Sequence, residues 1–212
     1  MTFDTTPQRV EFEKIAIPVK AVLRRLGYPA DGELNGQVKP LFENELRRAP
    51  EYFEPRGVYR ILPVKIRNHG IVAMKDENFQ IQSVQVANML RDSDHVVLFM
   101  TTLGPRLEEE VKRLFVEDRM AEAVILDAVG SETADTVADE LHHSVLPAVA
   151  GNEGFRVTPR FSPGYGDWPV TVQNEFLTAC RGDLIGITVN DSSLMHPRKS
   201  VSAVLGFVDR NE

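Results

Sequence analysis

The sequence has little cysteine: Cys180 is the only one among 212 residues. A single thiol excludes an internal disulfide framework and any cysteine-rich metal site, and we expect Cys180 to be a small buried hydrophobic residue. No segment approaches the roughly eighteen consecutive apolar residues that a membrane span requires. The first residues also lack the basic and apolar segments of a secretory signal peptide. These absences favour a cytoplasmic protein without a membrane span.

Basic charge is scarce as well. The chain has 24 Lys and Arg residues against 31 Asp and Glu residues, which gives a formal net charge of −7. Nucleic-acid binding relies on basic surface, so the composition argues against nucleic acid as the main partner. The glycine-rich phosphate-binding motifs, the G-x-S-x-G nucleophile motif and the H-E-x-x-H zinc motif are also missing. Several common classes of nucleotide-binding and hydrolytic enzyme are therefore disfavoured.

Apolar periodicity predicts an α+β fold in which helices pack on a largely antiparallel sheet. The run His95–Met100 is almost continuously apolar, which is typical of a strand buried on both faces. We expect residues 1–56 to form an N-terminal helical segment and residues 57–212 to form the α+β core. The predicted helices cover 10–28, 38–48, 83–90 (capped by Ser83), 106–117, 119–146 (closed by Pro147) and 172–179. The predicted strands cover 58–66, 70–74, 79–81, 95–100, 183–190 and 200–208.

The run Arg160–Pro169 concentrates unusual chemistry in ten residues, Arg-Phe-Ser-Pro-Gly-Tyr-Gly-Asp-Trp-Pro. Its two glycines allow a positive φ or a close approach of the backbone to a ligand. Arg160 offers a planar fork to a carboxylate or phosphate, Asp167 adds a second charge, and Tyr165 and Trp168 offer flat faces that attract a cation. A purely structural turn is the alternative. We favour a pocket for a small zwitterionic or positively charged ligand.

A basic pair lies between a proline and two serines in the segment Met195–Ser202. This pair, Arg198 and Lys199, precedes the last predicted strand. It suits either an anion-binding site or a solvated turn, and the sequence leaves both open.

The long predicted helix carries a polar stripe on one face. Its members are spaced by four, four and three residues, so they lie above one another along the helix. A carboxylate in this stripe suits a cationic ligand, although most such stripes simply face solvent. The adjacent pair of histidines points in directions about 100° apart, which makes a poor chelate, and we expect no metal site. The stripe consists of Ser131, Asp135, Asp139 and His142, with His143 next to it.

Three segments carry motifs of a known family in the same order. Ala134–His142 is similar to an Ala-Glu-x-x-Ala-Glu-x-Leu-His helix, Arg160–Tyr165 to Arg-x-x-Pro-Gly-Tyr, and Leu194–Ser202 to Met-x-Pro-x-x-Ser-Val-Ser. Together they resemble the S-adenosylmethionine-binding activation domain of cobalamin-dependent methionine synthase. The resemblance runs from about Val96 to about Phe207, and it implies a single α+β domain with a twisted antiparallel sheet.

The resemblance implies a role in reactivation. Reduction of an oxidised cobalt(II) corrinoid is coupled to methyl transfer from S-adenosylmethionine, with the electron supplied by a flavodoxin- or ferredoxin-type donor. Arg160 is expected to pair with the ligand carboxylate bidentately, and Asp135 stands where the family has an acidic residue one methylene longer. The implied cofactor-binding residues are Arg160, Ser162, Pro163, Gly164, Tyr165, Ser200 and Ser202, and the implied catalytic residues are Asp135 and Tyr165.

The sequence also departs from the family. It has no corrinoid-binding domain and no Asp-x-His-x-x-Gly motif for the lower ligand of the corrinoid. We therefore expect a free-standing activation protein whose cobalamin or other corrinoid is carried by a truncated methionine synthase or another corrinoid protein. One alternative is a non-catalytic docking or storage module for a corrinoid protein. A small-molecule methyltransferase is a weaker alternative, because no glycine-rich strand-turn-helix is present.

Overall fold

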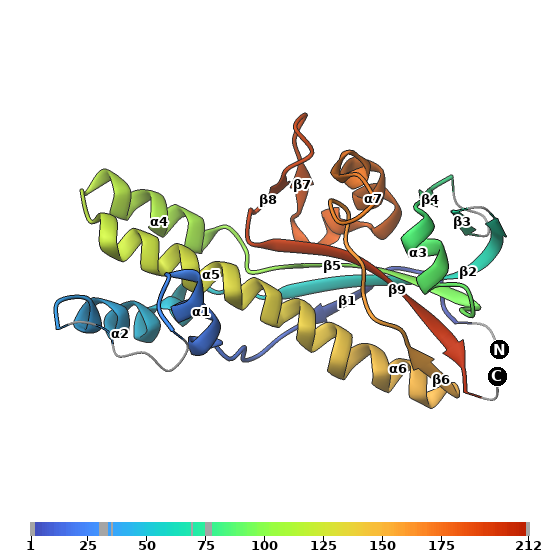
Figure 1. Cartoon of the computed structure of the whole chain (residues 1–212), viewed down its shortest axis with the longest axis horizontal. Helices are drawn as coiled ribbons and strands as arrows, with labels where there is room; N and C mark the ends of the chain where they lie inside the picture. Colours follow the sequence, from blue (N-terminus) through green and yellow to red (C-terminus); the bar gives the residue numbers. More distant parts are fainter. Residues whose placement is uncertain (1–2, 30–33, 35, 69, 75–77, 211–212) are drawn as a thin grey trace.

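The computed structural model describes residues 3–29, 34, 36–68, 70–74 and 78–210. Within them, seven strands form one antiparallel sheet in the order β4-β3-β2-β5-β9-β6, and β1 also pairs with β2 (Figure 1). This confirms the predicted α+β class and the largely antiparallel sheet. The strands are β1 (Gln8–Glu11), β2 (Arg56–Asn68), β3 (Ile71–Met74), β4 (Gln80–Gln82), β5 (His95–Thr102), β6 (Phe155–Val157) and β9 (Ser200–Asp209), and a separate hairpin pairs β7 (Thr188–Val189) with β8 (Met195–His196).

Most of the predicted helices are present in the structure, although several begin or end at other residues. In the described part of the chain, no helix combines the length and the apolar character needed to cross a membrane. The α-helices are α1 (Val19–Arg25), α2 (Val38–Arg48), α3 (Val84–Met89), α4 (Arg106–Val116), α5 (Met120–Glu140), α6 (Leu146–Asn152) and α7 (Gln173–Cys180). Shorter 3-10 turns are η1 (Ala49–Tyr52), η3 (Val170–Val172) and η4 (Gly182–Ile185), and η2 (Leu141–Val145) is a π-helical turn between α5 and α6.

Strand β5 is central and buried on both faces, as its apolar run predicts. Val96, Leu98 and Met100 pack into a core with α3 and α7, and Val97 and Phe99 pack into a second core with α5 and α6. The alternation follows from the two-residue period of a strand. Figure 1 shows α3 and α7 on one side of the sheet and α5 and α6 on the other. The sheet is therefore the middle layer of the molecule.

Three predicted elements are wrong in part. The helix expected over 10–28 begins only at Val19, because Gln8–Glu11 alternates in exposure and pairs with β2. Pro147 does not close the long helix, since it lies in the first turn of α6, where a missing N–H is tolerated. The strand expected over 183–190 is reduced to Thr188–Val189, because 183–185 belong to the turn η4 and Gly186 then takes a φ of +80°.

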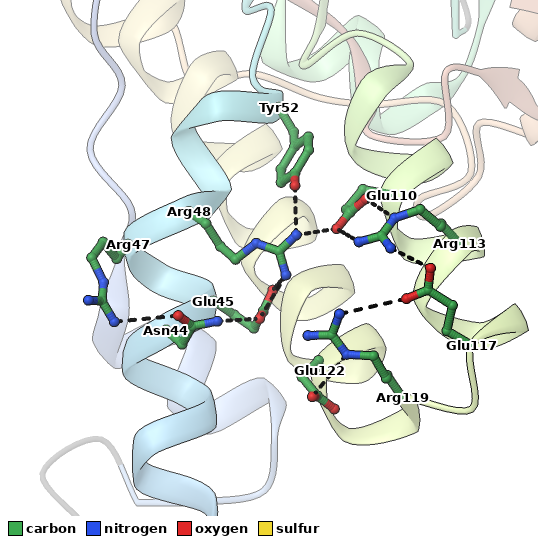
Figure 2. Close-up of polar contacts among 10 residues, drawn as sticks. All are labelled: Asn44, Glu45, Arg47, Arg48, Tyr52, Glu110, Arg113, Glu117, Arg119 and Glu122. Atoms are coloured by element: carbon green, nitrogen blue, oxygen red, sulfur yellow. Dashed lines mark hydrogen bonds and ion pairs between the residues drawn. The ribbon is translucent and has the colours of Figure 1, made fainter.

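The N-terminal helices pack against the α4–α5 pair. Val22 and Leu23 of α1 and Phe42 of α2 join a buried cluster with Leu107 of α4 and Leu126 of α5. A network of ion pairs borders this contact (Figure 2). It joins helices that are distant in the sequence.

Arg48 and Glu110 are the centre of this network. Arg48 of α2 pairs with Glu110 of α4, binds Glu45 at 3.2 Å and donates to the hydroxyl of Tyr52 at 2.7 Å. Arg113 donates to both carboxylate oxygens of Glu110 at 2.7 Å (Figure 2). These bonds from Arg113, together with smaller contributions from Tyr52 and Arg48, lower the pKa of Glu110 to about 2 against the opposing effect of burial. The folded state therefore favours the ionised carboxylate of Glu110.

We predict that Glu110→Ala lowers the free energy of unfolding by about 2 kcal/mol at neutral pH, because Arg48 and Arg113 lose the buried carboxylate that they share. The loss is limited because each arginine keeps another acidic partner, Glu45 or Glu117. The folded-state pKa of Glu110 lies below its ordinary value of 4.5. The stabilisation is therefore complete above that value and is lost as the pH falls towards 2. Urea unfolding of both proteins between pH 7 and pH 2.5 measures the difference.

Glu11→Ala is the matched control. Glu11 pairs with Arg9 at 3.0 Å, but both side chains are more than half exposed. Exposed pairs of this kind contribute at most about 0.5 kcal/mol. A loss in Glu110→Ala that equals the control, or that does not change with pH, contradicts the role assigned to the network.

Candidate functional site

A cavity of about 660 Å³ opens where four parts of the fold meet. Its walls come from α5, from the segment 160–173, from the β7–β8 hairpin with the residues after it, and from the start of β9. This volume is within the usual range for small-molecule sites. The lining residues are Asp135, 160–163, Tyr165, Val170, Gln173, 193–196, Arg198 and 200–202.

The cavity brings together segments that are far apart in the sequence. Each of the three segments with family-like motifs contributes to its walls: Ala134–His142, Arg160–Tyr165 and Leu194–Ser202. Of the site residues predicted from the sequence, only Gly164 does not line the cavity. The roles of these residues in ligand binding stay predictions. The predicted residues that line the cavity are Asp135, Arg160, Ser162, Pro163, Tyr165, Ser200 and Ser202.

The loop Arg160–Pro169 is held in a tight fold. Phe161 forms an antiparallel bridge with Val204 of β9, with both N–H···O bonds at 2.8 Å. Gly164 takes a φ of +95° and donates its N–H to the carbonyl of Trp168 at 2.8 Å, and Gly166 takes a φ of +55°. The sequence leaves a positive φ or a close approach to a ligand open for these glycines, and both adopt a positive φ, which lets the loop turn back on itself.

Trp168 does not offer its face to a ligand, contrary to the sequence-based expectation. Its side chain is only 1% exposed and packs against Phe176 with ring centroids 5.9 Å apart. Tyr165 is 70% exposed and lines the cavity. Trp168 and Tyr165 therefore have different roles: Trp168 fixes the loop in the core, and Tyr165 remains exposed for a ligand.

Asp167 also has a structural contact instead of a position in the cavity. Its carboxylate accepts hydrogen bonds from the hydroxyl of Ser83 and from the N–H of Val84, the latter at 2.7 Å. The hydrogen bond from Ser83 is the main cause of the lowered pKa of Asp167. Because these groups lie at the N-terminus of α3, Asp167 joins the loop to that helix. Ser83 itself caps α3, as the sequence predicts.

The polar stripe on α5 does not simply face solvent. Asp139 pairs with Arg160 at 3.0 Å, and His142 binds the carbonyl oxygen of Thr158 through Nε2 at 3.0 Å. Ser131 accepts a hydrogen bond from Lys199 at 2.8 Å. Asp135 and Asp139 are nevertheless exposed, so the stripe is a solvated surface in part. The stripe is the contact between α5 and the segments that shape the cavity.

Asp135, one turn before Asp139, lines the cavity itself. Desolvation raises the pKa of Asp135, and the positive charge of Arg160 opposes this effect. Asp135 and Arg160 place one acidic and one basic group in the lining of the cavity. Such a lining is suited to a ligand that carries charges of both signs.

The basic pair after the hairpin is split by the structure. Arg198 lines the cavity, whereas Lys199 turns to Asp127 at 2.7 Å. The sequence leaves open whether this pair forms an anion site or a solvated turn. In the structure, Arg198 is the member of the pair that lies where an anionic group in the cavity can reach it. The peptide N–H groups of both residues donate to Glu108 of α4, which holds this turn in place.

The two predicted serines already have partners in the protein. Ser200 bonds to the hydroxyl of Thr102 at 2.9 Å, and Ser202 accepts from the side-chain amide of Gln173 at 2.7 Å. Gln173 is buried and lines the cavity, but it is not among the residues predicted from the sequence. No motif marks this residue, because its place in the cavity follows from its hydrogen bonds to Ser202 of β9, which is distant in the sequence.

The remaining titratable groups offer little for metal or thiol chemistry. Among the described residues, no group of three or more His, Cys, Asp or Glu residues is placed to hold a metal ion. Cys180 is fully buried, and desolvation raises its pKa. This confirms its predicted role as a small core residue.

The comparisons with known proteins identify the fold. No protein-family model matches the chain, and no curated protein matches it. Its structure is similar to the crystal structure of the MetH reactivation domain bound to S-adenosylhomocysteine (AdoHcy), with a TM-score of 0.73 and 17% sequence identity. The match covers 95% of this chain and 78% of the other, so it extends well before Val96, where the sequence resemblance begins. The chain has the fold of a methionine synthase reactivation domain.

We predict that substitutions of Trp168 and Tyr165 have very different effects on the free energy of unfolding. Trp168→Ala removes a fully buried ring and should lower the free energy of unfolding by about 4 kcal/mol. Tyr165→Ala removes an exposed ring and should change the free energy of unfolding by no more than about 0.5 kcal/mol. Chemical unfolding followed by circular dichroism measures both. Equal effects of the two substitutions contradict the assignment of Trp168 to the core and Tyr165 to the cavity.

Proposed function

We propose that this chain binds S-adenosylmethionine in the cavity and supplies its methyl group to a corrinoid carried by a partner protein. The observation that carries the proposal is the convergence of the three motif segments on one cavity. The resemblance of the motifs rests on the sequence alone, and it concerns a domain whose fold the chain shares. That domain was crystallised with S-adenosylhomocysteine, the product that remains when S-adenosylmethionine gives up its methyl group.

The groups around the cavity fit the chemistry of S-adenosylmethionine. The ligand has a carboxylate, an ammonium group and a sulfonium. Arg160 has a buried nitrogen, Nη1, without a hydrogen-bond partner among the described residues, and this donor suits the carboxylate. Asp135 suits a positive group, and the exposed ring of Tyr165 suits the sulfonium or a flat part of the ligand. A cavity of about 660 Å³ has room for a nucleoside with an amino-acid tail.

The corrinoid is the substrate and lies outside the cavity in this proposal. A corrin macrocycle with its side chains is too large for the space enclosed, and the 212 residues contain no corrinoid-binding motif. One electron from a flavodoxin- or ferredoxin-type donor reduces cobalt(II) to cobalt(I). Cobalt(I) then takes the methyl group, and the electron pair of the broken carbon–sulfur bond remains on sulfur. We propose a truncated methionine synthase or another corrinoid protein as the carrier.

A non-catalytic docking or storage module is the second candidate function. The hydroxyls of Ser200 and Ser202 already bond within the protein, and Arg160 already pairs with Asp139. Such satisfied groups are consistent with a pocket that has lost its ligand. The unpartnered Nη1 of Arg160 favours the first candidate, because an unsatisfied buried donor is unfavourable without a ligand.

Isothermal titration calorimetry tests the binding step. We predict that the wild-type chain binds S-adenosylmethionine and that Arg160→Ala weakens binding at least about tenfold, since a charge-assisted hydrogen bond is lost. Arg156→Ala is the matched control, because Arg156 is exposed on β6 and does not line the cavity. No binding at millimolar ligand, or equal effects of the two substitutions, refutes the proposed site.

Reductive methylation separates the two candidate functions. A cobalt(II) corrinoid protein is mixed with a reductant, labelled S-adenosylmethionine and this chain, and the label on the corrinoid is measured. We predict label transfer that depends on the chain and falls at least about tenfold with Arg160→Ala, because the methyl donor is no longer held. Complex formation with the corrinoid protein without transfer of label supports the docking module and contradicts the first candidate.

A further inference from the structure

The backbone on either side of Arg160 is fixed by strand β9. The N–H of Thr158 donates to the carbonyl of Gly206 at 3.0 Å, and Phe161 exchanges two bonds of 2.8 Å with Val204. Thr158, two positions before Arg160, and Phe161, one position after it, are thus attached to the same strand. The side chain of Arg160 therefore starts from a defined point at the edge of the cavity.

The guanidinium of Arg160 is held at one terminal nitrogen and has, at the other, a buried donor without a partner in the described part of the chain. Its Nη2 pairs with Oδ1 of Asp139 at 3.0 Å. Its Nη1 is buried and has no hydrogen-bond partner within the described ranges. The arginine lines the cavity, whereas Asp139 does not. Asp139 consequently approaches Arg160 from outside the space that a ligand would occupy.

The neighbouring acidic residues of α5 have other positions. Glu132 pairs with Arg25 of α1, and Asp135 lines the cavity. Among the described residues, Asp139 is the carboxylate on this face that forms an ion pair with Arg160. One helix therefore presents a carboxylate to the cavity at Asp135 and, one turn later, a carboxylate to the arginine at Asp139.

We infer that Asp139 is a positioning residue that orients the guanidinium of Arg160 towards the carboxylate of the ligand. The inference rests on the proposed function, because it assigns the arginine to the carboxylate of S-adenosylmethionine. A planar guanidinium that is fixed at one nitrogen has its remaining donors directed in advance. Less rotational freedom is then lost when a ligand binds. Asp139 thus contributes to affinity for a carboxylate without touching the ligand.

The test compares two ligands, S-adenosylmethionine and its decarboxylated analogue, by titration calorimetry. We expect Asp139→Ala to weaken binding of S-adenosylmethionine about tenfold, the size of a coupling between groups in contact. The decarboxylated analogue lacks the group that Arg160 receives, so its affinity should change less than about twofold. Asp139→Asn keeps an oxygen acceptor for Nη2 and should recover part of the loss.

Glu140→Ala is the matched control, since it removes an exposed carboxylate from the same helix. Thermal melting of each variant establishes that it is folded. Equal weakening of both ligands by Asp139→Ala, no weakening, or tighter binding of S-adenosylmethionine overturns the inference. If the wild-type chain binds neither ligand, the proposed function fails and the inference fails with it. If the wild-type chain binds S-adenosylmethionine and Asp139→Ala has no selective effect, only the inference fails.

Discussion

The pairing of the segment 155–161 with strand β9 is the constraint on which the cavity depends. Residues 155–157 form strand β6 along β9, Thr158 bonds to Gly206, and Phe161 bridges to Val204. This series of backbone bonds carries the chain across the sheet and delivers the loop Arg160–Pro169 beside the start of β9. The serines of β9 and the arginine of the loop meet for that reason. Without this pairing, the three motif segments would have no shared surface.

The long helix provides the second half of the arrangement. Its apolar side packs on the face of the sheet that carries Val97 and Phe99. Its polar stripe then reaches the segment 158–160 through Asp139 and His142. The stripe therefore has a defined purpose in the fold: it closes one wall of the cavity and holds the arginine. Burial and polar contact act from the same helix on opposite sides.

Much of the fold follows from local patterns in the sequence. The continuous apolar run at 95–100 correctly predicts a strand buried on both faces, and Ser83 correctly predicts a helix cap. Local patterns fail where long-range pairing decides. Gln8–Glu11 becomes a strand only because it pairs with β2. The turn at Gly182–Ile185 occupies the first part of the strand predicted over 183–190, although the residue types there are typical of a strand.

The candidate site also has features that local sequence patterns predict and features that only long-range packing determines. Arginine and glycine in the loop are recognisable because their chemistry is unusual for a connector. The burial of Trp168, the contact of Asp167 with α3 and the presence of Gln173 in the cavity depend on packing between distant elements. Single-sequence reasoning has no access to that packing. The order of the three motifs supplies part of the missing information, because it relates this chain to a known fold. In that fold, the three motif segments of this chain line one cavity.

The central claim is that the cavity receives S-adenosylmethionine with its carboxylate on Arg160. A crystal structure of the chain with this ligand tests the claim most directly. The account predicts the ligand inside the cavity, its carboxylate within hydrogen-bond distance of Nη1 of Arg160, and the ion pair between Arg160 and Asp139 intact. A ligand bound elsewhere on the surface, or in the cavity with its carboxylate directed away from Arg160, contradicts the account.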